Sequence, residues 1–376
     1  MKTQSPIRAD ASQSPQRADC VASAALFAIL LFAAANFLSP IISASLADKL
    51  KLQDLTEHNL LANKLLRFLS SSANPDCVVI GSSLTITPAV RCDDAESGWV
   101  GARSDDYINS YDRAIYLQRL LSRAGIYTIA NLSVSGALVS DQWIILNREL
   151  ECGKRPKLII YGISPRDFID RFRSNPLHTP TLAAIGNLRL LPDLAATRLY
   201  PADAREFLCG ALCHIYKPRS FYKSTIASIF FLPDASSAAQ VSPHQRKPVS
   251  RSAFIAEQSA EYKRRYNPLD ENLYRAETAF FNRFLSIARE NNERVAVVVM
   301  PLTAANRNSL PPKFEWQWRQ MLKRACQRND ARLIDVATTT PFTDEDFEDS
   351  CHLNLRGGKK LFEAISAAII GQTSPK

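Results

Sequence analysis

Short apolar runs alternate with helical patterns from residue 76 onward, and this alternation restricts the fold more than any other feature of the chain. The apolar runs have the length of strands and lie at residues 77–80, 127–134, 157–164, 294–301 and 332–337. Apolar residues recur at helical spacing at residues 112–125, 136–151, 272–291, 314–329 and 357–370. Strands and helices that alternate through short connections form βαβ units. We therefore predict an α/β fold with a central parallel sheet that helices cover on both faces.

Two connections of this sheet carry more specific expectations. A polar loop is expected after the first strand, where Cys92 and several acidic residues follow. A helix is expected to open at Pro165, directly after the third strand, because proline suits the first helical position.

The N-terminal region has the composition of a membrane anchor. Residues 1–19 are polar, whereas residues 20–43 are apolar and carry no charge in the stretch 20–38. A bilayer is spanned by about 17–25 apolar residues, so we predict one transmembrane helix at 20–43. The small residues at 33–35 leave a cleaved signal peptide as the alternative. A slight excess of basic residues before the segment predicts a cytoplasmic N-terminus and an extracytoplasmic main domain.

The rest of the chain divides into a connecting helix and one large domain. Residues 44–75 have apolar residues at helical spacing and are expected to lead away from the membrane. Residues 76–376 form the α/β domain. Within it, residues 173–260 are rich in Pro, Ser and Arg and break the alternation. We interpret them as an irregular insertion that helps shape or cover a site.

The composition excludes some classes of protein and leaves several partners open. A hydrophobic fraction of 46% and a charged fraction of 22% are those of a folded globular chain. The net charge of +9 suits an acidic polymer, anionic lipid or nucleic acid. Nucleic acid is not expected, because no basic stripe is interleaved with aromatic residues. The eight cysteines have irregular spacing without paired CxxC units, so a zinc site is not expected. We predict neither a metal nor a cofactor.

Two polar stretches could carry chemistry. Ser82 and Ser83 follow the first apolar strand, at the sheet edge where open α/β folds bind their ligands. Their hydroxyls could cap a helix, or one could be a nucleophile. Far along the chain, Asp349 lies three residues before His352, so that on a turn the carboxylate could orient the imidazole. The alternative for Asp349 and for the nearby Asn354 is an ordinary role in a turn or a cap.

Taken together, these stretches resemble the blocks of the SGNH, or GDSL-like, hydrolase superfamily. The first block corresponds to Gly81-Ser82-Ser83-Leu84, which follows the first strand. The second centres on Gly136 within 131-NLSVSGA-137, and the last is the Asp-x-x-His pair formed by Asp349 and His352. The resemblance spans roughly residues 76–370 without the insertion. It implies a flavodoxin-like, three-layer α/β/α fold.

The resemblance also implies roles for particular residues. Ser83 would be the nucleophile, His352 the general base and acid, and Asp349 the residue that orients the imidazole. The backbone N–H groups of Ser83 and Gly136 would contribute to an oxyanion hole. The family places an asparagine in that hole after the third strand, where this chain has Ser164.

The replacement of the family's asparagine by Ser164 leaves two roles open for this serine. The serine could donate one hydrogen bond to the oxyanion, or it could cap the helix through Ser-Pro-Arg-Asp, with Asp167 reaching back to it. Arg166 could hold an anionic group of the substrate or pair with Asp167.

A single anchor, an extracytoplasmic domain and the Gly-Ser-Ser variant resemble envelope acyl-transfer proteins. Examples of that group are the D-alanyl-lipoteichoic acid transfer protein and the alginate-type O-acetyltransferases. The resemblance implies acyl transfer to or from an envelope glycan, which could be acidic. It also implies a membrane-bound O-acyltransferase as partner. The alternatives are a plain esterase or lipase-like hydrolase, and a non-catalytic scaffold of a polysaccharide export complex.

Overall fold

The computed structural model describes most of the α/β domain and short parts of the preceding chain. The described residues are 26–34, 53–99, 101, 103–173, 179–190, 192, 194 and 251–371. Residues 26–34 are helical, and the apolar side chains from Leu26 to Phe32 are between 53% and 68% exposed. None of the described helices is long and apolar enough to cross a membrane. The predicted tail, the rest of the predicted anchor and much of the predicted insertion at 173–260 lie outside the described residues.

Five parallel strands form the sheet, in the order β2-β1-β3-β4-β5. The strands are β1 (Cys77–Ile80), β2 (Ile129–Asn131), β3 (Leu158–Ile163), β4 (Val295–Val299) and β5 (Arg332–Ile334). This is the flavodoxin-like order, in which the direction of chain progression reverses between β1 and β3. Every residue of β1, β3 and β4 is buried, as expected for strands covered on both faces. The predicted parallel α/β sheet is therefore confirmed.

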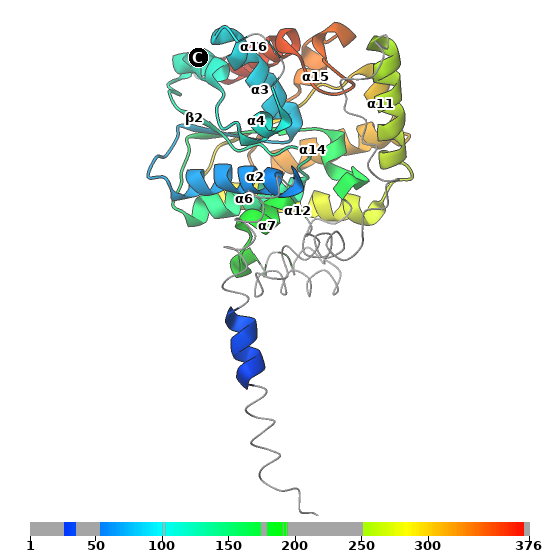
Figure 1. Cartoon of the computed structure of the whole chain (residues 1–376). Helices are drawn as coiled ribbons and strands as arrows, with labels where there is room; N and C mark the ends of the chain where they lie inside the picture. Colours follow the sequence, from blue (N-terminus) through cyan, green and yellow to red (C-terminus); the bar gives the residue numbers. More distant parts are fainter. Residues whose placement is uncertain are drawn as a thin grey trace, which may run out of the picture.

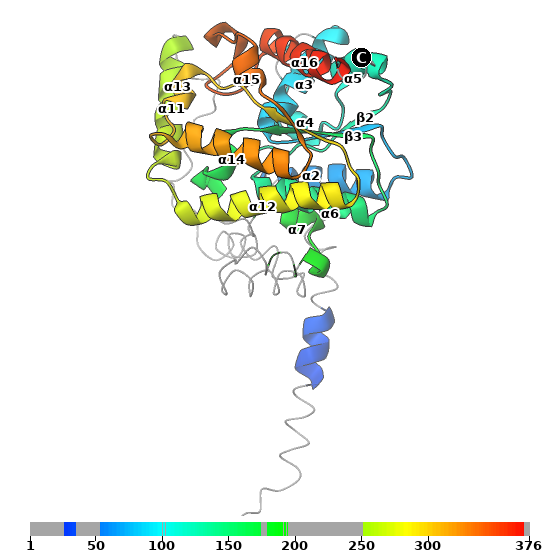
Figure 2. The same ribbon diagram turned by 180° about the vertical axis from the view of Figure 1, so that it is seen from behind.

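Helices cover both faces of the sheet (Figures 1 and 2). Alternate residues of β1 enter different cores, with Val78 and Ile80 in one and Cys77 and Val79 in the other. Residues of the following helices lie in the first core: α2 (Gln53–Ser70), α6 (Val139–Glu151), α7 (Pro180–Ile185), α12 (Glu271–Glu290) and α14 (Phe314–Arg328). Residues of the following helices lie in the second: α3 (Ser83–Glu96), α5 (Ile115–Leu121) and α16 (Leu355–Ile370). Two cores on one sheet make three layers.

Shorter elements complete the domain. The remaining described α-helices are α4 (Asp105–Ser110), α11 (Arg251–Tyr266), α13 (Ala304–Arg307) and α15 (Val336–Thr339). The 3₁₀ turns are η1 (Ser122–Ala124), η2 (Pro165–Phe168), η3 (Arg171–Arg173), η5 (Leu188–Leu190) and η7 (Asp344–Asp346). In Figure 1, α11 runs along one side of the molecule and crosses the level of the sheet. This helix contacts α13 and η3, both of which follow sheet strands.

The structure corrects two local predictions. The expected polar loop after the first strand is the fourteen-residue helix α3. Two of its acidic residues, Asp93 and Asp94, are buried. Asp93 accepts hydrogen bonds from the N–H groups of Ile115 and Tyr116, both at 2.7 Å, and so caps α5. The expected helix at Pro165 is the single 3₁₀ turn η2. Elements distant in sequence pack against both: α5 and α16 contact α3, and α12 contacts η2.

Candidate active site

The turn after β1 places Ser83 at the carboxyl edge of the sheet. Gly81 has a φ of +156°, and a Cβ there would lie 2.3 Å from Thr85 Oγ1 and 2.7 Å from the Gly162 carbonyl oxygen. Only glycine fits such a turn without displacing its neighbours. Ser82 occupies the N-cap position of α3 but makes no side-chain capping hydrogen bond. Ser83 is therefore the first residue of α3, close to the point where the strand order reverses.

The last connection of the chain brings His352 to this serine. His352 Nε2 lies 2.8 Å from Ser83 Oγ, and His352 Nδ1 lies 2.6 Å from Asp349 Oδ2. The other carboxylate oxygen of Asp349 accepts from the backbone N–H groups of Cys351 at 2.8 Å and His352 at 2.7 Å. Asn354 then caps α16, accepting from the N–H groups of residues 356 and 357. The turn thus fixes the imidazole through Nδ1, and Nε2 faces Ser83.

The charges of Asp349 and His352 stabilise each other. Burial alone would raise the pKa of Asp349, but hydrogen bonds from His352 outweigh it and lower that pKa to about 2. Burial alone would lower the pKa of His352, but Cys351 and the Asp349 carboxylate outweigh it and raise that pKa to about 10. Both side chains are about 20% exposed. The imidazole therefore binds a proton strongly, and it must lose that proton before it can accept one from Ser83.

The loop that contains Gly136 runs beside the serine turn. Val134 N–H donates to the Gly81 carbonyl at 2.9 Å, two residues before Gly136. Gln142 Nε2 donates to the same carbonyl at 2.8 Å. On the other side, the buried Lys64 of α2 donates to the Ser133 carbonyl at 2.6 Å. These bonds hold the Gly136 loop next to the corner at which Ser83 begins α3.

Ser164 lies at the carboxyl end of β3 and is fully buried. Its N–H and its hydroxyl both donate to Asp167 Oδ2, at 2.8 Å and 3.2 Å. The predicted reach of Asp167 back to Ser164 is therefore confirmed. Burial raises the pKa of Asp167 to about 6. In this arrangement the Ser164 hydroxyl has a protein acceptor.

Arg166 lies beside the turn that contains Asp349 and His352. Its Nη1 atom is 3.3 Å from both Cys351 Sγ and the Tyr262 hydroxyl. Its Nη2 atom is 3.6 Å from Asp170, so that its ion pair is with Asp170 rather than with Asp167. The guanidinium is largely buried, with 6% of the residue exposed. Sequence reasoning missed Cys351 and Tyr262 at this site, because Cys351 occupies an unspecified position of the Asp-x-x-His pair and Tyr262 belongs to no recognisable motif.

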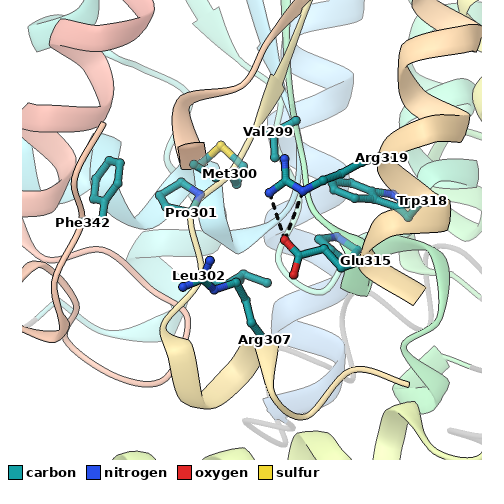
Figure 3. Close-up of a pocket in the computed structure, with 11 residues that line it drawn as sticks. Val299, Met300, Pro301, Leu302, Arg307, Glu315, Trp318, Arg319 and Phe342 are labelled. Carbon is teal, nitrogen blue, oxygen red and sulfur yellow. Dashed lines mark hydrogen bonds and ion pairs between the residues drawn. The ribbon is translucent and has the colours of Figure 1, made fainter. Parts of the chain in front are cut away.

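A small pocket opens at the same edge of the sheet, beside the ends of β3 and β4 (Figure 3). Its volume is about 40 Å³. Figure 3 shows Met300, Pro301 and Phe342 on one side and the Glu315–Arg319 ion pair, at 3.0 Å, on the other. Pro165 also lines it, directly after Ser164. The pocket thus adds apolar and charged groups to the edge that carries the serine.

Asp349, Cys351 and His352 also bring oxygen, sulfur and nitrogen atoms within 4.8 Å of one another. Both imidazole nitrogens already face Asp349 and Ser83. The Arg166 guanidinium, 3.3 Å from the sulfur, would repel a metal cation. The arrangement favours proton transfer over metal binding.

Comparisons with known proteins give distant similarities. No protein-family model and no curated protein sequence matches the chain. One similar solved structure is LAE5, an alpha/beta hydrolase enzyme from the metagenome of Lake Arreo, Spain, at 12% identity and a TM-score of 0.35. That match covers 81% of this chain and 99% of the other.

A second similar structure is a catalytic mutant of Axe2, an acetylxylan esterase from Geobacillus stearothermophilus. The identity is 11% and the TM-score 0.37, with 80% of this chain and 96% of the other covered. Similarity this distant does not establish an activity. The chemistry of the site therefore rests on the geometry of its own residues.

Proposed function

We propose that this chain is a serine-dependent acyltransferase of the SGNH type that acts outside the cytoplasm. The observation that carries the proposal is the continuous series of hydrogen bonds from Ser83 through His352 to Asp349, at 2.8 Å and 2.6 Å. A serine hydroxyl becomes a useful nucleophile when a base takes its proton and a third group orients that base.

In the first half of the reaction, Ser83 Oγ attacks the carbonyl carbon of an ester. Its proton passes to His352 Nε2, while Asp349 holds Nδ1–H and stabilises the imidazolium. The carbonyl electrons move to oxygen, and the N–H groups of Ser83 and Gly136 are the proposed donors to that oxyanion. The tetrahedral intermediate collapses when the ester C–O bond breaks. The departing alkoxide takes the proton from His352 and leaves an acyl group on Ser83.

In the second half, an acceptor hydroxyl gives its proton to His352 and attacks the acyl-enzyme. Collapse releases the acylated acceptor and returns the proton to Ser83. We propose an envelope polysaccharide or glycolipid as acceptor, or as donor in the reverse direction. The uncharged stretch at 20–38 supports a membrane anchor, and the net charge of +9 supports an acidic glycan. A membrane-bound O-acyltransferase is the proposed partner that supplies the acyl group.

The test is covalent labelling of the full-length chain, dispersed in detergent, with a fluorophosphonate probe. We expect one adduct, located by mass spectrometry on Ser83 and lost in Ser83→Ala and His352→Ala. Ser82→Ala is the matched control, because it removes the neighbouring hydroxyl and should leave the adduct in place. A folded wild-type chain without an adduct would refute an activated serine and favour the scaffold role.

A second measurement separates transfer from hydrolysis. The chain is given p-nitrophenyl acetate with an acidic or a neutral oligosaccharide, and the acetylated sugar is compared with free acetate. We expect the acidic sugar to divert acetyl groups from water in a Ser83-dependent way. Acetate as the sole product with both sugars would favour the plain esterase.

A further inference from the structure

The sulfur of Cys351 has an unusual position relative to the catalytic imidazole. Cys351 Sγ lies 3.6 Å from Nδ1 and 3.9 Å from Nε2 of His352. An atom nearly equidistant from both nitrogens and lying in the ring plane would overlap a ring carbon at these distances. The sulfur therefore lies over a face of the ring, while Asp349 and Ser83 contact its two nitrogens.

Arg166 and Tyr262 hold the sulfur in this place through hydrogen bonds. Arg166 Nη1 and the Tyr262 hydroxyl each lie 3.3 Å from Cys351 Sγ, and they lie 3.3 Å from each other. A guanidinium can donate but cannot accept, so the sulfur accepts from Arg166. Cys351 is 1% exposed, and water therefore does not compete for these contacts. The sulfur thus lies between the guanidinium and the imidazole.

The backbone of Ser350, in the same turn, is also held by hydrogen bonds to side chains of other elements. Gln258 of α11 accepts from Ser350 N–H at 3.0 Å, and Thr303 Oγ1 donates to the Ser350 carbonyl at 2.6 Å. Tyr262 is also on α11, one turn beyond Gln258. The side chains of α11 therefore fix the backbone of the turn and the side chain of Cys351 together.

We propose that Cys351 is a positioning residue for the catalytic imidazole: its sulfur, held by Arg166 and Tyr262, stabilises the imidazolium that forms when His352 takes the Ser83 proton. This inference deepens the proposed function and rests on it. The sulfur is polarisable and electron-rich, so its contact with the ring face favours the cation. It also keeps the Arg166 guanidinium from facing the imidazolium directly, where two like charges would repel.

The charged groups near this contact have partners of opposite charge. Asp349 binds the ring in its plane, and Glu348 of the same turn is paired with Arg91 of α3 at 2.7 Å. Behind the sulfur, Asp170 contacts Arg166 and binds Arg265 Nε at 2.8 Å. Tyr266 stacks on Tyr262, with ring centroids 5.5 Å apart. The arginines thus have a carboxylate partner, and Cys351 faces the ring without an intervening charge.

The experiment measures the protonation of the His352 imidazole directly. The full-length chain, labelled with ¹⁵N at its five histidines, is titrated in detergent by two-bond ¹H–¹⁵N spectroscopy, with His352→Gln to assign the signal. We expect the titration midpoint of His352 to fall by about one pH unit or more in Cys351→Ala. Cys351→Ser, which is close to isosteric, should shift it in the same direction and keeps the test valid if Cys351→Ala does not fold. Cys326→Ala, at another buried cysteine, should leave it unchanged.

The titration reports on the His352 ring whether or not Ser83 reacts. The role of Cys351 and the proposed acyl transfer can therefore be refuted independently of each other. An unchanged midpoint in a folded Cys351→Ala or Cys351→Ser chain would overturn the role of Cys351. If Ser83 were still labelled in that case, the proposed function would stand. A midpoint that falls in a chain whose Ser83 is never labelled would support the contact with the ring and refute the proposed acyl transfer.

Discussion

Replacing Asp349 by asparagine tests the hydrogen-bonded series Ser83–His352–Asp349 most directly, because it removes the negative charge of the side chain and keeps its shape. Asp349 Oδ1 accepts from the N–H groups of Cys351 and His352, and an asparagine carbonyl oxygen can keep both bonds. The turn should therefore survive. What is lost is the negative charge 2.6 Å from His352 Nδ1. The asparagine amide would instead donate to Nδ1 and force the ring proton onto Nε2, which then cannot accept the proton of Ser83.

The expected loss is large. A wrong tautomer in a Ser-His-Asp triad reduces the rate by about 10⁴-fold, and each factor of ten corresponds to about 1.36 kcal/mol in the activation barrier. We therefore expect Ser83 in Asp349→Asn to react with a fluorophosphonate roughly 10³- to 10⁴-fold more slowly, a loss of about 4–5.5 kcal/mol. The His352 titration midpoint should fall as well, because the carboxylate that raises its pKa is gone.

The assay is the second-order rate constant of labelling, measured with the unfolding curve of the same preparation. Asp335→Asn is the matched control, because Asp335 is a partly exposed carboxylate paired with Arg319, and its loss should leave labelling within a few-fold of wild type. A folded Asp349→Asn chain that labels at the wild-type rate would refute the role given to Asp349. It would also show that the imidazole keeps its orientation without the carboxylate.

Three further outcomes are expected. Gly162→Ala should lower the free energy of unfolding in urea by about 1–3 kcal/mol, because its Cβ would lie 2.5 Å from Thr85 Oγ1, and Thr85→Ala should restore part of the loss. Labelling of Ser83 should speed up from pH 7 to 10, since His352, with a pKa of about 10, must first lose its proton; a rate that falls over this range would contradict that. Burial lowers the pKa of Lys64 to about 7, below its ordinary value of 10.5, so unfolding takes up a proton between these values. The stability of wild type relative to Lys64→Met should therefore increase from pH 7 to 10, and a pH-independent difference would refute the assignment.

Much of the fold follows from local patterns in the sequence. The run at 77–80 becomes β1 with the same bounds, and the helical pattern at 272–291 becomes α12 to within one residue at each end. Such elements are predictable because burial on both faces selects apolar strands, and burial on one face selects a helical stripe. The approach of Ser83 to His352, 269 positions later, follows from the parallel sheet, since its carboxyl ends meet at one edge.

Other features depended on contacts that no local pattern contains. The acidic residues of α3 suggested a solvated loop, yet Asp93 is buried because it caps α5. The Ser-Pro-Arg-Asp stretch contained its own cap, but it did not reveal that only a single 3₁₀ turn follows, against which α12 packs. Spacing could not reveal these outcomes, because each depends on a partner from another element.

The sequence by itself determined the strands, most of the helices and the positions of Ser83, Asp349 and His352 along the chain. These depend on periodicity and on turn residues within a few positions. Tertiary structure alone decided the surroundings of the His352 imidazole. Cys351 contacts the ring because Arg166 from the end of β3 and Tyr262 from α11 converge on its sulfur. Three-dimensional packing brings these side chains together, and only in that packing does the thiol lie against the imidazole.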